Sequence, residues 1–248
     1  MTDARPVIVS CYFAARGGGD HWRRMASVLR STASDYCPGW DQDIREMAAP
    51  TAVGGKRAGD TANSAKLSHW TDAVMAAADG QRILLIDTDT AIVRSLDSIW
   101  DRSFDLAYTT KRDTFPFNAG VIFLRVSATT RAFMAAWLAE NQRLYRDPAA
   151  HNRCRMKHGG MNQAALGSLM DQGAAAWRAL DVLELPCTEW NCEDSAWAHF
   201  DPARTRILHV KGSFRFELLG PSMMRNSARR PAAEFWRSRD RAVMEARA

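Results

Sequence analysis

Residues 83–89 read Ile-Leu-Leu-Ile-Asp-Thr-Asp, an apolar run that ends at two carboxylates one residue apart. Such a run predicts a buried strand. Side chains at positions i and i+2 of an extended segment point the same way, so Asp87 and Asp89 would lie together at the carboxyl edge of a sheet. Two carboxylates there suit a divalent cation that carries a diphosphate. The alternative is a solvated turn after a core strand, because Asp-x-Asp also arises by chance.

Strand and helix patterns alternate along the chain, which predicts an α/β sheet with crossover helices. The expected strands cover residues 6–13, 83–86, 105–108, 117–124, 183–185 and 207–210. The expected helices include one with Trp22 on its apolar side, one over 64–78 with Lys66 near its start, one over 130–145 and one that opens at 160. Residues 50–63, rich in glycine, predict a mobile loop, and residues 153–158 a basic loop.

Composition limits the class of protein. With 248 residues and 46% hydrophobic content, the chain can bury a large core as one domain. The five cysteines show no Cys-x-x-Cys spacing, which favours reduced thiols over disulfides or a zinc site. No stretch approaches the ~20 apolar residues of a membrane span, and the start lacks the pattern of a signal peptide. We therefore expect a cytoplasmic protein without a transmembrane segment.

The positive charge is concentrated in the C-terminal segment. Residues 215–248 hold eight of the arginines and four acidic residues, against a net charge of +5 for the whole chain. Phe235, Trp236 and Val243 follow near-helical spacing among these arginines, which predicts a helix with one apolar and one cationic face. Such a helix would either pack on the body of the protein or bind a phosphate-rich partner such as nucleic acid or anionic lipid.

Several short segments occur in one order over about residues 6–215 and together resemble a known family. In chain order they are Lys66 within a helix, Ile86-Asp87-Thr88-Asp89-Thr90, Phe117-Asn118-Ala119-Gly120-Val121, Asn162-Gln163, Leu185-Pro186 with Trp190-Asn191, and Ile207-Leu208-His209-Val210-Lys211-Gly212. The set resembles GT-A-fold glycosyltransferases, especially glycosyltransferase family 8. The resemblance implies a Rossmann-like α/β domain over residues 1–214, with a mixed, mostly parallel central sheet flanked by helices. Residues 215–248 would form a basic helical extension.

The resemblance also implies roles for the matching residues. Asp87, Asp89 and His209 would bind Mn²⁺ or Mg²⁺ on the donor diphosphate, where the cation would neutralise the leaving nucleoside diphosphate. Asn118 and Gln163 would lie at the donor sugar as catalytic residues, together with Asn162. The remaining donor-binding residues would be Tyr12, Lys66, Thr88, Gly120, Lys211, Gly212 and Arg215.

The chain departs from the family pattern at two positions. Arg215 stands where the family commonly has lysine, and arginine keeps the positive charge and can bind phosphate bidentately. Asn162 stands in place of the aspartate of the family's Asp-Gln pair. A carboxylate often found beside the donor sugar is therefore missing, which leaves the sugar and the stereochemistry open.

No spacing identifies a catalytic base. An inverting enzyme needs a carboxylate or histidine to deprotonate the acceptor hydroxyl. Polar residues near the expected active-site loops are Glu189, Glu193, Asp194 and His158. A retaining enzyme needs no protein base if the leaving phosphate takes the proton, and the resemblance to family 8 favours retention.

These observations predict a metal-dependent glycosyltransferase that moves a hexose from a UDP-sugar, or a related nucleotide sugar, to an acceptor hydroxyl. The acceptor would be a saccharide or glycolipid, or a hydroxymethylated base in DNA bound by the basic loop and tail. A base in DNA would have to be flipped from the duplex. One alternative is a binding module or inactive paralogue that keeps the fold. Another is a nucleotidyltransferase, although residues 17–20 match its glycine-rich basic loop poorly.

Overall fold

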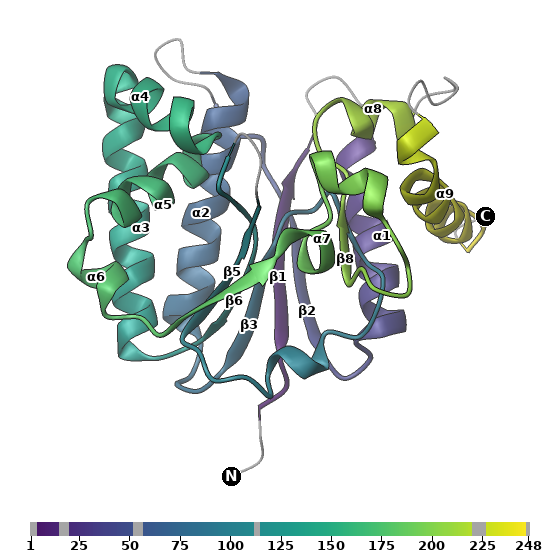
Figure 1. Ribbon diagram of the computed structural model, residues 1–248, viewed down its shortest axis with the longest axis horizontal. Helices are drawn as coiled ribbons and strands as arrows, with labels where there is room; N and C mark the ends of the chain where they lie inside the picture. The colour runs from purple at the N-terminus through teal and green to yellow at the C-terminus, as the bar shows by residue number, and fades with distance from the viewer. Residues whose placement is uncertain (1–3, 15–19, 52–56, 112–114, 220–226, 247–248) are drawn as a thin grey trace.

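The computed structural model describes residues 4–14, 20–51, 57–111, 115–219 and 227–246. Within them, the central sheet has the strand order β2-β1-β3-β6-β5-β7. Pairing is parallel between β1 and its two neighbours and between β5 and β7, whereas β6 runs antiparallel to both β3 and β5. Helices cover both faces of the sheet (Figure 1). The predicted mixed, mostly parallel sheet flanked by helices is confirmed.

The elements have the following bounds. The strands are β1 (Val7–Phe13), β2 (Asp41–Met47), β3 (Arg82–Ile86), β4 (Thr90–Ile92), β5 (Leu106–Thr110), β6 (Phe117–Arg125), β7 (Val182–Pro186) and β8 (Ile207–His209). The α-helices are α1 (His21–Tyr36), α2 (Ala58–Ala76), α3 (Ala128–Arg146), α4 (Pro148–His158), α5 (Met161–Asp171), α6 (Ala175–Arg178), α7 (Cys187–Trp190), α8 (Ser213–Leu219) and α9 (Arg230–Glu245). Short 3₁₀ turns are η1 (Asp97–Ile99), η2 (Asp194–His199) and η3 (Ser227–Arg229).

Strand β3 lies inside the sheet and is buried on both faces. Ile83 and Leu85 pack with the helices α2, α3 and α5, whereas Leu84 and Ile86 pack on the opposite face with α1. Successive side chains of a strand point to opposite faces, so a strand covered on both sides needs an unbroken apolar run. The apolar sequence before Asp87 is therefore a requirement of its position.

A second, two-stranded sheet carries the late part of the chain back to the aspartates. Strand β4 follows the Asp87–Asp89 segment directly and pairs antiparallel with β8, so that Thr90 faces His209. The backbone N–H of Val210 also donates to the carbonyl of Asp89, at 2.8 Å. This pairing places a histidine from residue 209 beside carboxylates from residues 87 and 89.

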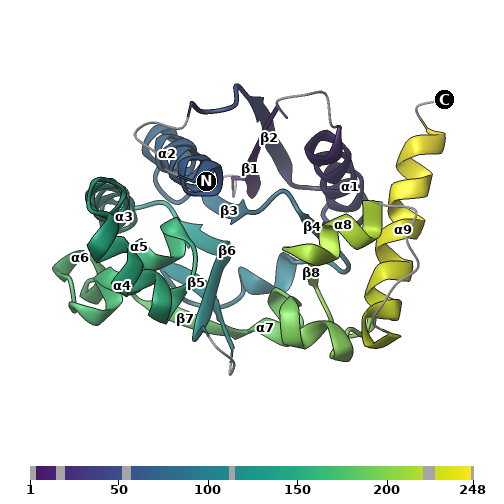
Figure 2. The same ribbon diagram turned by 90° about the horizontal axis from the view of Figure 1, so that it is seen from above.

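Helix α9 packs along α1 at the side of the molecule (Figures 1 and 2). Trp236 is fully buried there, and Arg24 of α1 bonds to the buried carboxylate of Asp240. Arginines near this interface are also engaged: Arg237 donates to the carbonyl of Glu217 at 3.0 Å, and Arg239 pairs with Asp35 at 3.0 Å. The predicted terminal helix is present, and part of its cationic face is used in packing.

Two local predictions are wrong, and one strand was not predicted. Residues 153–158 are helical and belong to α4, whose start is marked by Asp147, which accepts a hydrogen bond from the N–H of Ala150 at 3.0 Å. Helix α2 begins at Ala58, six residues before the predicted start, so Lys66 lies in its interior. The strand β2 was not predicted, because it is an edge strand with one buried side chain, Ile44.

Two expectations from the sequence concern glycine-rich segments and membrane-spanning helices. The triple glycine at 17–19 and residues 52–56 of the expected mobile loop lie outside the described residues. Within the described ranges, none of the helices has the length and apolar character that crossing a membrane requires.

Candidate functional site

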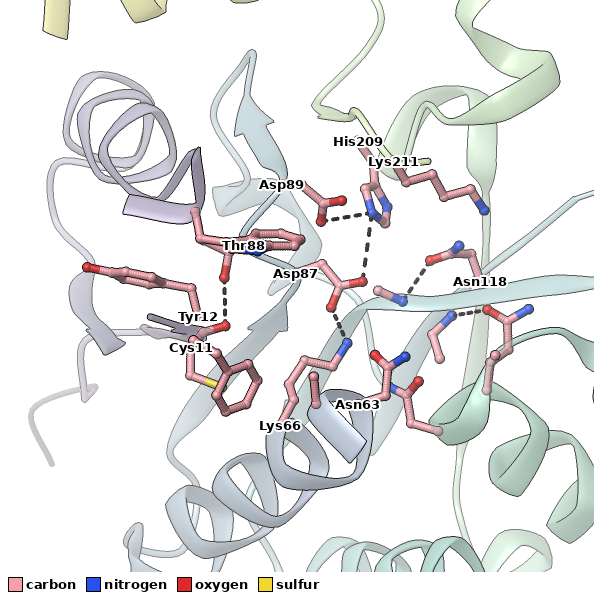
Figure 3. A pocket seen from close by; sticks show the side chains of 18 of the residues that line it. Cys11, Tyr12, Asn63, Lys66, Asp87, Thr88, Asp89, Asn118, His209 and Lys211 are labelled. Carbon is pink, nitrogen blue, oxygen red and sulfur yellow. Dashed lines mark hydrogen bonds and ion pairs between the residues drawn. The ribbon is translucent and has the colours of Figure 1, made fainter. Parts of the chain in front are cut away.

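A cavity of about 290 Å³ opens at the carboxyl edge of the central sheet, next to Asp87 (Figure 3). It collects nearly all the residues that the sequence singled out. Those that line it are Tyr12, Lys66, Asp87, Thr88, Asp89, Asn118, Gly120, Asn162, Gln163, His209, Lys211 and Arg215. Gly212 does not line it. That glycine has a φ of 61° and makes the turn from β8 into α8.

Three potential metal ligands meet in this cavity. The imidazole Nε2 of His209 lies 3.3 Å from Asp89 Oδ1 and 3.7 Å from Asp87 Oδ2. One ligand atom from each of the three residues lies within 4.8 Å of the others. Two carboxylates and one imidazole form a donor set that suits Mn²⁺ and is compatible with Mg²⁺. The side chains therefore fit a divalent cation.

Asn191 fixes the orientation of the His209 ring. Its Nδ2 donates to Thr109 Oγ1 at 2.9 Å and to Asn118 Oδ1 at 3.0 Å. Its Oδ1 lies 2.9 Å from His209 Nδ1 and accepts the proton of that nitrogen. In the neutral ring Nε2 then carries the lone pair, and it faces the two aspartates. Such an outer hydrogen bond sets the tautomer of a metal-binding histidine.

Gly120 leaves the space that the cluster occupies. A Cβ atom at this position would lie 2.6 Å from Asp87 Oδ2 and 2.7 Å from His209 Cε1. Both distances are shorter than a non-bonded contact allows. The backbone N–H of Asp87 also donates to the Gly120 carbonyl, at 2.8 Å, which holds the two strands at this separation. The glycine thus makes room for the aspartate and histidine side chains.

Two cations flank the aspartates. Lys66 from α2 is buried and bonds to Asp87 Oδ1. Arg215 from α8 lies 3.1 Å from Asp89 Oδ2, with its guanidinium 4.7 Å from the centre of the Trp22 ring. Burial alone would raise the pKa of Asp89, but His209, Arg215 and Lys66 together hold that pKa well below its usual range. The carboxylate is therefore ionised and ready to bind a cation.

Lys211 also reaches the cavity, but its ammonium is paired. It bonds to the fully buried carboxylate of Glu193 and lies 2.7 Å from Asp194 Oδ2. Lys111 bonds to the same glutamate from the other side. Burial raises the pKa of Glu193, although Lys211 opposes this effect. The cluster stabilises the wall of the cavity, and Lys211 would have to exchange a partner to bind phosphate.

The amides of Asn118 and Gln163 hold the backbone at the inner end of the cavity. Asn118 Oδ1 accepts from the N–H of Gly120 at 2.7 Å. Gln163 Oε1 accepts from the N–H of Ala119 at 3.2 Å, and its Nε2 donates to the carbonyls of Phe117, at 2.9 Å, and of His158. Gln163 thus ties the start of α5 to β6, which gives it a positioning role.

Tyr12 and Thr88 contribute mainly to the framework. The Tyr12 ring is buried beside α1, and its hydroxyl donates to Glu46 at 3.2 Å. In Figure 3 the ring points away from the aspartates. The Thr88 hydroxyl donates to the carbonyl of Cys11 at 2.7 Å, which fastens the aspartate segment to β1.

The four acid–base residues considered from sequence do not meet at the cavity. Glu189 pairs with Arg206 at 2.9 Å, and Asp194 pairs with Lys211. Glu193 and His158 line a second cavity of about 1010 Å³, where His158 Nε2 lies 2.8 Å from Asp171 Oδ2. None of the four lines the cavity that holds the aspartates.

Sequence reasoning missed the roles of Trp22 and Asn191. Trp22 fits the apolar period of α1, so nothing local separates it from a core residue, yet it is only partly buried and lines the cavity. Asn191 stands next to Trp190 in a segment that matched the family, which was the signal available for it. Its partners come from three distant strands, and sequence spacing does not reveal them.

Solved structures with the same arrangement are glycosyltransferases. One acts in the glycosylation of the major capsid of PBCV-1, with 11% identity, 97% of this chain and 100% of that chain covered, and a TM-score of 0.57. The galactosyltransferase LgtC, solved with donor and acceptor sugar analogues, has 13% identity, 95% of both chains covered and a TM-score of 0.54. GlyE of Streptococcus pneumoniae TIGR4 has 11% identity and a TM-score of 0.57, with 98% of this chain and 62% of GlyE covered.

The chain has the GT-A fold. At these identities the likeness establishes the fold alone. No protein-family model matches the sequence, and no curated protein is significantly similar to it. Membership of glycosyltransferase family 8 therefore stays a prediction. Within the GT-A fold, the Asp87, Asp89 and His209 cluster lies at the carboxyl edge of the sheet, where ligands bind in open α/β folds.

Proposed function

We propose that this protein is a metal-dependent glycosyltransferase that moves a hexosyl group from a nucleotide-diphosphate sugar, a UDP-sugar, to an acceptor hydroxyl with retention. The observation that carries the proposal is the meeting of Asp87, Asp89 and His209 at the cavity of a GT-A fold. Sugar donors of this class carry a diphosphate, and the cluster with its neighbouring cations would hold one.

Different residues of the site would bind the metal and the phosphate groups of the donor. Asp87, Asp89 and His209 would hold Mn²⁺ or Mg²⁺, which when bound would neutralise charge on the leaving nucleoside diphosphate. Lys66 and Arg215 each contact one of the aspartates. Both cations can turn toward phosphate once a metal shares those carboxylates. Arg215 would bind the phosphate oxygens bidentately, with its guanidinium supported by Trp22.

Retention is supported by the carboxylates that the cavity offers. Among the described residues that line it, the carboxylates are Asp87 and Asp89, and both face His209. Carboxylates that hold a metal do not serve as a base for an acceptor hydroxyl. An oxygen of the leaving phosphate is then the group placed to take that proton, which is the arrangement of a retaining transferase.

A saccharide or the head group of a glycolipid suits the acceptor side. The second cavity adjoins the first, because Gln163 Nε2 donates to the carbonyls of two of its lining residues, Phe117 and His158. Its lining mixes rings with acidic, basic and hydroxyl groups, including Tyr108 and Glu184, which suits sugar hydroxyls. DNA has less support, because Lys157 of the basic segment pairs with Asp171, at 2.7 Å, and tail arginines pair within the protein.

The decisive test is donor binding with and without metal. We expect UDP and Mn²⁺ together to raise the melting temperature more than either alone, because each contributes contacts to the same site. Asp87→Asn and Asp89→Asn should abolish this joint effect and the metal-dependent hydrolysis of UDP-sugars. Asp101→Asn, at an exposed turn, is the matched control and should behave as the wild type.

The same measurements separate this function from a binding module or inactive paralogue. Such a protein would bind a nucleotide sugar without hydrolysing it or transferring the sugar. Full activity in the presence of EDTA, with both aspartates replaced, would contradict the metal-dependent mechanism. To identify the acceptor, saccharides, glycolipids and hydroxymethylated DNA are incubated with the protein and the best donor. Mass analysis then shows which of them gains a sugar.

A further inference from the structure

Each aspartate of the metal cluster is already paired with a cation of the protein. Lys66 bonds to Asp87 Oδ1, as Figure 3 shows, and Arg215 Nη1 lies 3.1 Å from Asp89 Oδ2. Both aspartates also lie close to Nε2 of His209. A divalent cation that enters this cluster must therefore share the carboxylates with two positively charged side chains.

Aromatic rings hold both cations beside the aspartates. The Lys66 ammonium lies 4.5 Å from the centre of the Trp70 ring, and the Arg215 guanidinium lies 4.7 Å from that of Trp22. The face of an aromatic ring attracts a cation. Only 9% of the Lys66 side chain is exposed, so its charge stays close to the site when Asp87 takes another partner. Arg215 is 25% exposed and can turn outward.

The charges of the cavity balance without a metal. Among the described residues that line it, Lys66 and Arg215 offset the two aspartates, and Lys211 is offset by the buried Glu193. A divalent cation alone would leave its own charge uncompensated beside a buried lysine. Like charges repel strongly at short range where water is excluded. A diphosphate, with a negative charge on each phosphate, would restore the balance.

We propose that Lys66 and Arg215 keep a free divalent cation out of the site until a nucleotide diphosphate binds with it. Without the diphosphate, both side chains neutralise the aspartates and repel a metal. With it, both turn toward the phosphate oxygens and leave the carboxylates to the metal. Metal and nucleotide then raise each other's affinity by the same factor, as linkage requires. This inference rests on the proposed function and concerns the regulation of its site.

The test measures the affinity for Mn²⁺ alone and with UDP, from the electron paramagnetic resonance signal of free Mn²⁺. A titration without protein corrects for the Mn²⁺ that UDP binds in solution. In the wild type we expect UDP to tighten the binding of Mn²⁺ at least tenfold. Lys66→Met removes the charge and keeps the length of the side chain. This variant should bind Mn²⁺ alone at least tenfold more tightly than the wild type and should bind UDP more weakly.

The direction of the effect separates the inference from a merely structural role. Damage to the fold lowers the affinity for a metal, whereas removal of a repelling charge raises it. Arg215→Leu, at a partly exposed position, should also bind Mn²⁺ alone more tightly, and it decides the question if Lys66→Met does not fold. Arg102→Leu removes the same charge at an exposed turn outside the cavity and should bind Mn²⁺ as the wild type does.

Three results would overturn the inference. The first is that the wild type binds Mn²⁺ as tightly without UDP as with it. The second is that neither Lys66→Met nor Arg215→Leu gains affinity for Mn²⁺ alone, and the third is that Arg102→Leu gains as much as they do. If Mn²⁺ and UDP together do not bind to the wild type, the proposed function fails. If they bind and the two variants gain nothing, only the inference fails.

Discussion

At the scale of single residues, Gly120 ties the shape of the backbone to the metal cluster. Its missing side chain leaves the volume that Asp87 and His209 occupy, and the nearest atoms would lie within 2.7 Å of an added Cβ. The Asp87 and His209 side chains cannot both move away from an added Cβ, because Asp87 bonds to Lys66 and His209 bonds to Asn191. Any residue larger than glycine here must displace a ligand.

Gly120→Ala should therefore impair the site more than the fold. We expect Mn²⁺-dependent binding of UDP to weaken at least tenfold, because the methyl group pushes a ligand out of position. Calorimetric titration with UDP and Mn²⁺ measures the effect. Gly39→Ala is the matched control, since a Cβ at Gly39 meets nothing within 4 Å. Unchanged UDP binding in Gly120→Ala would show that the cluster does not bind the donor.

The sequence analysis identified most of the residues that line the cavity, but it missed some of the contacts that these residues make. The aspartates were predicted because two carboxylates after a buried strand suit a divalent cation, whereas His209 was predicted through the resemblance to GT-A glycosyltransferases. Gly120 and Lys211 were both assigned to the binding of the donor. Their steric and ion-pair partners come from other elements, which the sequence does not order in space.

At the scale of elements, Asn191 connects three strands to the metal cluster. From the end of α7 it bonds to Thr109 of β5, Asn118 of β6 and His209 of β8. The pairing of β5 with β6 shifts register between Tyr108 and Thr109, next to these contacts. The local irregularity and the asparagine together set where the histidine ring lies.

Asn191→Leu should weaken Mn²⁺ binding about 10–100-fold, the usual cost of losing an outer hydrogen bond to a metal ligand. The Leu side chain fills the volume but leaves the His209 tautomer unset. Manganese binding followed by electron paramagnetic resonance measures the affinity directly. Asn152→Leu, at an exposed position, is the control. An unaltered manganese affinity in Asn191→Leu would contradict the role given to this residue.

Glu140 joins α3 to α5 and makes that contact sensitive to pH. Its carboxylate accepts from Ser168 at 2.6 Å and from Arg143 at 2.7 Å. Burial alone would raise the pKa of Glu140, but Arg143 and Ser168 lower it below its ordinary value. The carboxylate therefore stabilises the protein fully above the ordinary glutamate pKa of about 4.3, and this stabilisation is lost as the pH falls through the lower folded pKa.

Glu140→Gln should remove this dependence. We expect the wild type to exceed the variant in unfolding free energy by about 1 kcal/mol at pH 6, and the difference to shrink toward pH 3. Urea denaturation at several pH values measures both proteins. Glu245→Gln, on an exposed carboxylate of α9, should show a constant difference. A difference for Glu140→Gln that grows as the pH falls would refute the assignment.

Helices and strands could be predicted from the sequence where the apolar periodicity is strong, and the prediction failed where it is weak. The buried apolar run before Asp87 predicted its strand, whereas α4 has no apolar periodicity and is held by its cap and by packing on α5. Its signal was the pair Asp147-Pro148, a cap residue followed by a proline suited to a first turn. Strand β2 exists because β1 offers it a parallel edge, which is a tertiary cause.

At the scale of the whole molecule, α9 is held by a buried tryptophan as well as by charge. Trp236 is 1% exposed in a cluster that includes Met25 and Val28 of α1. Trp236→Ala should cost about 3–5 kcal/mol of unfolding free energy, as for other large core side chains. Met244→Ala, on an exposed part of the same helix, should change it by about 0.5 kcal/mol or less. Chemical denaturation measures the unfolding free energy of both variants. Equal losses in the two would mean that the packing of α9 contributes little to the stability of the protein.

The contact between Arg24 and Asp240 joins residues 216 positions apart, and β8 brings His209 back to Thr90 in the same way. Contacts of such separation form late, because the intervening chain must first be ordered. During synthesis, the first half of the sheet emerges from the ribosome with its aspartates and without their histidine. Metal affinity should thus appear only after release of the late residues, and a stalled nascent chain ending before residue 207 would carry an incomplete site.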